Sequence, residues 1–237
     1  MTKSLKELGV LPELKTFDIF HPCSLEQIEQ LCKNSTICVT KHRESLFEFG
    51  NPAHYFCVVL SGAYKLSRPS AGGENSIVHF SAPGDVIAAF IMPQPQPVYP
   101  LNVISMGPSR ALKIPRENYL ESWHQMPDLI FRVQSLLSAR MNALQNQKAL
   151  TKAPLPSKVA SFLVHLIEHQ QLKNSSEQVQ IPIPLTRKEI ADSVGATVES
   201  VIRIMSDWSK KGLIQTNDQQ ITILNTKEII RIIDSSL

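Results

Sequence analysis

Two oppositely charged side chains near the end of the chain have the spacing and the chemistry to read DNA bases. Glu199 and Arg203 are four residues apart, so in a helix they lie on one face and can hold each other in place. An arginine can bind guanine through two parallel hydrogen bonds, and a glutamate can accept from the amino group of cytosine. Nearby polar residues offer further contacts to bases or phosphates: Thr197, Ser200 and Lys210.

The residues around this pair predict a helix-turn-helix. A first helix begins at Thr186, with Glu189 at the distance of a capping box, and ends before Gly195. A second helix over 198–210 has an apolar face opposite the charged pair. Helical pairs with a glycine turn also occur in proteins that do not bind DNA, so the polar face of the second helix carries the DNA prediction.

The segment after the second helix predicts a hairpin, or wing. Apolar and polar residues alternate over 212–224 on both sides of Asn217-Asp218, which are typical turn residues. A last short helix is expected over 226–233.

Cysteines and histidines are the other residue types that could support chemistry. Cys23, Cys32, Cys38 and Cys57 match no paired zinc spacing, and the seven histidines form no metal-binding or nucleophile–base pattern. An early cysteine cluster can hold an iron–sulfur cluster or a haem, but free cysteines are more often small buried hydrophobes. We therefore expect no metal site and no catalytic residues, and hence a protein that is not an enzyme.

Composition limits the class of protein. The chain has 237 residues, 43% of them hydrophobic, which is enough to form the core of one large or two small domains. No apolar run approaches the ~18 residues of a membrane helix, and the N-terminus lacks the apolar segment of a secretory signal. We expect a cytoplasmic protein with no membrane partner. The net charge of +3 is too small to indicate a polyanion partner by itself.

Residues 36–116 have the pattern of an antiparallel β-domain. Short apolar runs such as 55–60 alternate with turns rich in Gly, Pro and Asn, which favours a sandwich or a jelly roll. We therefore expect an α+β protein with an N-terminal jelly-roll β-barrel, a long dimerisation helix and a C-terminal winged helix-turn-helix. The expected segments are 1–126 for the β-domain, 127–152 for the dimerisation helix and hinge, and 153–237 for the winged helix-turn-helix.

A long amphipathic helix is expected after Pro127. Apolar residues recur there at spacings of three and four, with no Gly or Pro between them up to about Leu150. This seam has two explanations: it faces an identical helix in a parallel dimer, or it packs on the chain's own barrel. The predicted dimer seam consists of Leu129, Val133, Leu136, Leu137, Met141 and Leu144.

Together these segments resemble the CRP/FNR family of bacterial transcription regulators. The resemblance covers nearly the whole chain, includes Leu60-Ser61-Gly62 and Pro83-Gly84-Asp85, and is most specific over 185–191 and 197–204. Family members fold as a cyclic-nucleotide-binding-like β-roll, a long dimerisation helix and a winged helix-turn-helix. The resemblance implies that Glu199 and Arg203 read a guanine-containing half-site and that Arg187 approaches the phosphate backbone.

The start of the second helix is most similar to the FNR branch of the family, whose half-site core resembles TTGAT. The catabolite activator branch has Arg where Val198 stands. One departure is Ile202, where the FNR branch usually has Ser. The predicted DNA-binding residues are Arg187, Thr197, Val198, Glu199, Ser200, Arg203 and Lys210.

The barrel departs from the nucleotide-binding pattern of the family. Cyclic-nucleotide binders have a Glu that holds the ribose and an Arg that neutralises the cyclic phosphate; here Ala89 and Tyr99 occupy those positions. A buried phosphate would lack its charge partner, which argues against cyclic AMP in its usual pose. The cysteine spacing of the iron–sulfur branch is missing and no haem ligand can be assigned, so the effector stays unknown. The expected effector pocket comprises Gly84, Asp85, Ala89, Tyr99 and Asn102.

The leading hypothesis is a homodimeric regulator that binds a palindromic double-stranded DNA operator, with RNA polymerase as a further partner. Each recognition helix would enter a major groove, with half-sites about one helical turn apart. Two alternatives stay open. The first is a constitutive regulator whose barrel is only a scaffold, and the second is a small-molecule or redox sensor that acts through protein partners.

Overall fold

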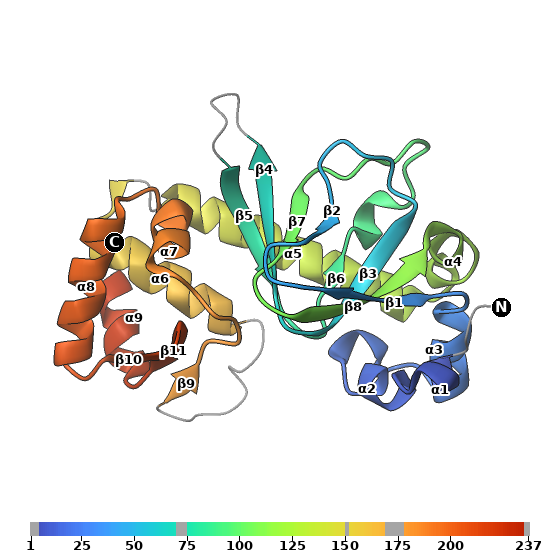
Figure 1. Ribbon diagram of the computed structural model, residues 1–237, viewed down its shortest axis with the longest axis horizontal. Helices are drawn as coiled ribbons and strands as arrows, with labels where there is room; N and C mark the ends of the chain where they lie inside the picture. Colours follow the sequence, from blue (N-terminus) through green and yellow to red (C-terminus); the bar gives the residue numbers. More distant parts are fainter. Residues whose placement is uncertain (1–4, 70–74, 150–151, 169–177, 235–237) are drawn as a thin grey trace. The chain divides into compact units, whose positions relative to one another are not determined.

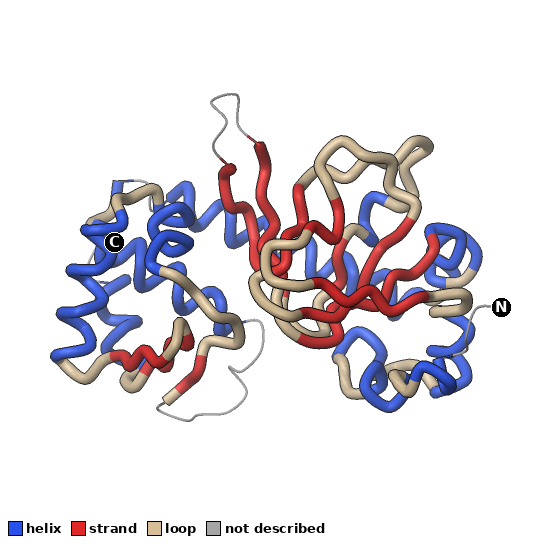
Figure 2. The backbone as a smooth tube through the Cα atoms, in the orientation of Figure 1, coloured by secondary structure: helices blue, strands red, loops and turns tan. Residues whose placement is uncertain are grey.

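The computed structural model describes residues 5–69, 75–149, 152–168 and 178–234. The chain divides into two compact units, Met1–Arg140 and Met141–Leu237. Strands dominate the first unit and helices the second (Figure 2). The division lies within the long helix that the sequence predicts after Pro127.

The first unit contains two four-stranded antiparallel sheets. Their strands are β1 (Thr36–Thr40), β2 (Ser45–Phe47), β3 (Tyr55–Ser61), β4 (Tyr64–Pro69), β5 (Asn75–Ser81), β6 (Val86–Ile87), β7 (Asn102–Ser105) and β8 (Ser109–Pro115). One sheet has the order β1-β8-β3-β6 and the other β2-β7-β4-β5 (Figure 1). Successive strands therefore cross repeatedly between the sheets, as in a jelly roll. The predicted fold class, α+β with an N-terminal jelly-roll barrel, is confirmed.

The first unit also contains short helices, which the sequence patterns above did not predict. The helices are α1 (Leu5–Leu8), α2 (Leu11–Lys15), η1 (Asp18–Phe20), α3 (Leu25–Leu31), η2 (Ala89–Ile91), α4 (Arg116–Glu121) and η3 (Trp123–Gln125). Trp123 joins them to the barrel: its ring lies edge-on to Phe56 with centroids 4.9 Å apart. Its indole N–H donates to the Leu31 carbonyl at 3.0 Å, so this buried aromatic side chain keeps its polar atom satisfied.

The long helix α5 (Pro127–Ala149) corrects the predicted dimer seam. Leu129 and Val133 are buried in the core of their own barrel, so they are not free for a partner helix, and the half-buried Leu136 packs against that core. Phe131, which the predicted seam omits, is 64% exposed, and Met141 is 57% exposed. Leu137 is half-buried, and Leu144 lies outside the residues whose side chains the structure describes. The apolar seam thus serves the barrel along the first half of the helix.

The second unit is a helical domain with a small sheet. Its elements are α6 (Leu155–Glu168), β9 (Val179–Gln180), α7 (Arg187–Val194), α8 (Val198–Lys210), β10 (Ile214–Asn217), β11 (Gln220–Ile223) and α9 (Thr226–Asp234). Helix α6 begins at Leu155, and Pro156 fits the first turn of a helix. The predicted hairpin is β10–β11, and β9, which was not predicted, adds a third strand in the order β10-β11-β9.

One glycine of the barrel occupies a site that no other residue can fill without strain. Gly62 has φ +77°, and an added Cβ would lie 2.6 Å from the Pro108 carbonyl oxygen and 2.7 Å from Ser109 Cα. We expect Gly62→Ala to lower the free energy of unfolding of the barrel by about 2–4 kcal/mol, because backbone strain adds to a clash with fixed main-chain atoms. Urea unfolding followed by the fluorescence of Trp123, in a Trp208→Phe background, measures this.

Gly50→Ala is the matched control for this substitution. Gly50 also has a left-handed backbone, with φ +83°, but no atom lies within 4 Å of the added Cβ. Its expected loss is about 1 kcal/mol, from the backbone alone. Equal losses for the two variants would contradict the proposed close approach at Gly62.

Candidate nucleic-acid interface

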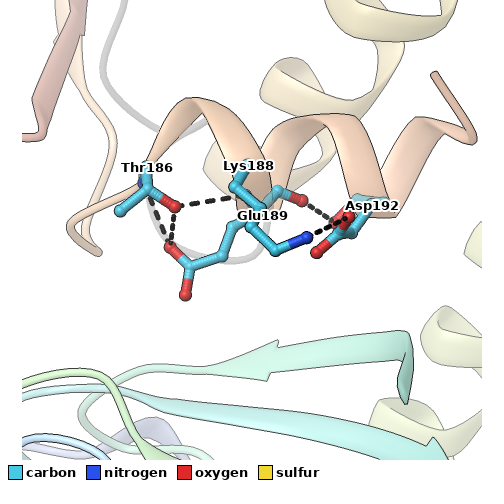
Figure 3. A network of polar contacts seen from close by, with 5 residues as sticks. Thr186, Lys188, Glu189 and Asp192 are labelled. Carbon is cyan, nitrogen blue, oxygen red and sulfur yellow. Dashed lines mark hydrogen bonds and ion pairs between the residues drawn. The ribbon is translucent and has the colours of Figure 1, made fainter. Parts of the chain in front are cut away.

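A reciprocal capping box holds the first helix of the predicted helix-turn-helix. The Glu189 backbone N–H donates to Thr186 Oγ1 at 3.1 Å, and the Thr186 N–H donates to Glu189 Oε2 at 3.0 Å (Figure 3). The other end of α7 is capped by Gly195, whose φ of +67° turns the chain so that the next residue, Ala196, donates its N–H to the Ala191 carbonyl at 3.0 Å. Both ends of α7 are therefore defined locally, as the sequence predicted.

The second helix, α8, has one buried and one exposed face. Val201, Met205 and Trp208 are buried. The opposite face exposes four residues at helical spacing: Glu199, Ile202, Arg203 and Ser206. A helix whose apolar side is held by its domain can present the other side to a groove of DNA without unfolding.

One predicted DNA-binding residue, Thr197, is the N-cap of α8, and a second, Ser200, is its hydrogen-bond partner in the first turn. Thr197 Oγ1 accepts from the Ser200 N–H at 3.3 Å and donates to Ser200 Oγ at 3.1 Å. Thr197 is exposed, whereas Val198 and Ser200 are half-buried. Lys210 is exposed in the last turn. These side chains thus lie at the two ends of the helix that carries Glu199 and Arg203.

Arg187 connects the first helix to the wing. One guanidinium N–H donates to Thr216 Oγ1 of β10 at 3.0 Å, and partial burial lowers the pKa of the guanidinium. This contact places Arg187 between α7 and the hairpin, a link that sequence spacing could not reveal because 29 residues separate the two. A phosphate contact by Arg187 stays a prediction.

The Pro-Gly-Asp segment of the predicted effector pocket closes a turn of the barrel. Asp85 Oδ2 accepts from the Ala82 N–H at 2.9 Å, and the Gly84 N–H donates to the Val59 carbonyl at 2.9 Å. From α5, Arg140 donates to the Val86 carbonyl at 3.2 Å. Burial lowers the pKa of Arg140, and the negative charge of Asp85 counteracts this effect. The turn is thus attached to the long helix.

Tyr99, which stands where the resembled family has its phosphate-binding arginine, belongs to an aromatic stack. Tyr99 lies on Phe47 with ring centroids 4.1 Å apart, and its hydroxyl donates to the Tyr55 carbonyl at 2.8 Å. Ala89 is buried, and Asn102 Oδ1 accepts from the Phe49 N–H at 2.8 Å. Tyr99 and Asn102 thus contact other residues of the barrel.

A cavity of about 270 Å³ lies beside this stack. Tyr99 is the member of the predicted pocket that reaches it, whereas Gly84, Asp85, Ala89 and Asn102 do not line it. Lys113 supplies a cation to the lining, with its ammonium group 4.5 Å from the centre of the Tyr55 ring. The lining residues are Ser45, Leu46, Phe47, Glu48, Asn51, Pro52, His54, Tyr55, Tyr99 and Lys113.

Comparison with known proteins identifies a domain family for each of two segments of the chain. Residues 39–125 match the family of the cyclic nucleotide-binding domain, and residues 157–232 match that of the Crp-like helix-turn-helix domain. The chain belongs to the CRP/FNR family. It is accordingly a transcription regulator with a DNA-binding helix-turn-helix, and the resemblance inferred from the sequence is confirmed. The family consists of transcription regulators, not enzymes.

Relatives of this CRP/FNR protein match it over most of its length. The transcriptional activator protein anr of Pseudomonas aeruginosa is 28% identical over 190 residues, 80% of this chain and 77% of the relative. The CRP-like cAMP-activated global transcriptional regulator of Mycobacterium tuberculosis is 23% identical over 189 residues, 79% and 83% of the two chains. The structure of FixK2 from Bradyrhizobium japonicum has a TM-score of 0.70 at 18% identity, covering 84% of this chain and 96% of that one.

The cysteines of this CRP/FNR protein lie mainly in its core. Cys23, Cys32 and Cys57 are buried, and burial raises the pKa of each of the three thiols. In the described ranges, no three His, Cys, Asp or Glu side chains are grouped so that they could hold a metal ion.

None of the helices that the structure describes combines the length and the apolarity needed to cross a membrane.

Proposed function

We propose that the protein acts as a homodimer that binds a palindromic operator and regulates transcription through sequence-specific DNA contacts. The observation that supports this most directly is the exposed face of α8. Glu199 and Arg203 lie there side by side in helical spacing, opposite the buried Val201, Met205 and Trp208. In this proposal the segments 1–126, 127–152 and 153–237 have the sensor, dimerisation and DNA-binding roles expected from the sequence.

We propose that Glu199 and Arg203 select bases and that the polar residues around them position the helix on the DNA. Arg203 would bind a guanine through two hydrogen bonds, and Glu199 would accept from a cytosine amino group. Lys210 and the remaining polar residues of α8 would contact phosphates, which position the helix without selecting a sequence. RNA polymerase is the proposed protein partner at the promoter.

The exposed side of α5 is proposed as the dimer interface. Phe131 and Met141 are ten residues apart, which matches an a and a d position of successive heptads in a coiled coil. Burying them against the same residues of a second copy would remove two large apolar groups per chain from water. The resulting two-fold symmetry would place two recognition helices on half-sites about 34 Å apart.

The aromatic stack in the barrel supports a second candidate, a regulator that does not depend on cyclic AMP. Tyr99 and Phe47 occupy the region where the family pattern has its phosphate-binding arginine, and Tyr99 is already held by the Tyr55 carbonyl. A phosphate placed against this stack would meet aromatic faces and lose its hydration there, and the cation in the lining of the neighbouring cavity, Lys113, lies over the Tyr55 ring. The barrel would then bind another effector or act only as a scaffold.

Selection from a pool of random double-stranded DNA tests the function. We expect enrichment of a palindrome, and specific binding that weakens steeply as salt concentration rises. Thermal unfolding of the same protein is then measured with each of a panel of cyclic mono- and dinucleotides. Cyclic AMP should not raise the midpoint temperature of unfolding. Absence of any enriched sequence with all ligands tested would contradict the proposal.

Lys210 provides a prediction about phosphate binding. We expect Lys210→Gln to weaken binding to the operator and to random DNA by a similar factor. The slope of log K against log salt concentration should become shallower by about 0.9 for each phosphate that the lysine no longer neutralises, twice that for a dimer. Fluorescence anisotropy at several salt concentrations measures both quantities.

Lys227→Gln is the control for Lys210→Gln. It removes the same charge from an exposed lysine of the same unit, on α9 instead of α8, and should leave the salt slope nearly unchanged. A weaker affinity for the operator alone, with an unaltered slope, would assign Lys210 to base recognition instead.

A further inference from the structure

The recognition face of α8 contains one large apolar side chain among its polar ones. Ile202 is 47% exposed. It follows Glu199 by three residues and precedes Arg203 and Ser206 by one and four, so all four side chains share one side of the helix. The buried side of α8 is formed by other residues, so Ile202 adds little to the packing of its own domain.

The apolar side chain of Ile202 limits which chemical groups of DNA it can contact favourably. The edges of base pairs in the major groove present hydrogen-bond donors and acceptors, with one apolar exception, the 5-methyl group of thymine. A branched aliphatic side chain cannot satisfy a donor or an acceptor, and placing it against one would leave that group without water. Contact with the methyl group removes apolar surface of both partners from water.

We propose that Ile202 reads a thymine in each half-site through contact with its 5-methyl group. This inference rests on the proposed DNA-binding function of α8. Ile202 and Arg203 are adjacent in the sequence and both exposed on α8, and base pairs are stacked about 3.4 Å apart. The thymine therefore lies within about two base pairs of the guanine that Arg203 reads, on either strand.

Deoxyuridine provides a probe that removes only the methyl group. In the operator obtained by selection, each thymine is replaced in turn by deoxyuridine, in both half-sites, and the dissociation constant of the full-length protein is measured by anisotropy. Loss of one buried methyl corresponds to about a fourfold weaker affinity per half-site, or roughly fifteenfold for the two together. Wild-type protein should show this loss at one position of the half-site.

The variant Ile202→Ser should bind the thymine and deoxyuridine operators equally at that position, whereas Ile202→Val should keep a smaller difference. Ile230→Ser, a change at an exposed isoleucine of α9, is the matched control and should discriminate like the wild type. Because Ile202 is exposed, Ile202→Ser should also unfold at the wild-type temperature.

The experiment distinguishes the role of Ile202 from sequence-specific DNA binding by the protein. Specific binding by wild-type protein with no loss at any deoxyuridine would overturn the role of Ile202 and leave the proposed function intact. The same loss in wild type and in Ile202→Ser would assign the methyl contact to another residue. Failure to bind any DNA sequence specifically would overturn the proposed function itself.

Discussion

Arg203→Ala is expected to lose about 1–3 kcal/mol of discrimination at one G·C pair in each half-site, a factor of roughly 5–150. The guanidinium is exposed on α8 beside Glu199, so its replacement removes two hydrogen bonds to guanine while leaving the fold of the domain unchanged. Binding to operators with each base pair at that position should become nearly equal. Competition with a set of single-base operator variants measures the change.

Two comparisons distinguish a base contact from a general loss of charge. Arg231→Ala removes an exposed arginine of α9, one that pairs with Glu228 at 3.0 Å, and should retain the wild-type preference. Arg203→Lys keeps the charge but lacks the planar two-point geometry, so it should keep nonspecific affinity and lose much of the preference. If Arg203→Ala weakened operator and random DNA by the same factor, Arg203 would be a phosphate contact.

Replacement of both Phe131 and Met141 by glutamate should convert the dimer to a monomer. Each side chain is more than half exposed on α5, and in the proposed interface it meets its own copy, so four carboxylates would be brought together in place of four apolar groups. A monomer engages one half-site at a time and loses the effective concentration supplied by its partner, so operator affinity should fall about 10²-fold or more. Sedimentation velocity and anisotropy measure the two effects.

The control for this variant carries the same added charge at other exposed apolar sites. Val39 on β1 and Leu120 on α4 are exposed, and their joint replacement by glutamate should leave the dimer and its DNA binding intact. A Phe131/Met141 variant that stayed dimeric at micromolar concentration and bound the operator normally would show that dimerisation uses another surface.

The helix-turn-helix was predictable from the sequence because local interactions define it. The capping box of Thr186 and Glu189 joins residues three apart, and the left-handed stop at Gly195 needs no distant partner. The amphipathic pattern of α8 likewise separates its buried residues from Glu199 and Arg203 within a few turns. Each of these signals lies within one stretch of chain, so it can be recognised without knowledge of the rest of the fold.

Other elements depend on distant partners and escaped prediction. Strand β9 has two residues and exists because it pairs with β11, some forty positions later. Helix α3 is held against the barrel by the Trp123 contact to Leu31. Such short segments lack a periodic pattern of their own, so tertiary contacts decide their conformation.

The sequence by itself determined the family, the order of barrel, long helix and winged helix-turn-helix, and which face of α8 is polar. Those features follow from motifs, turn residues and local periodicity. Only the tertiary structure decided how the apolar residues of α5 are divided: Leu129 and Val133 enter the barrel core, while Phe131 and Met141 remain exposed. It also placed Tyr99 on Phe47 in the barrel interior. Periodicity shows that a side chain is apolar, but the packing of distant segments determines which apolar surface covers it.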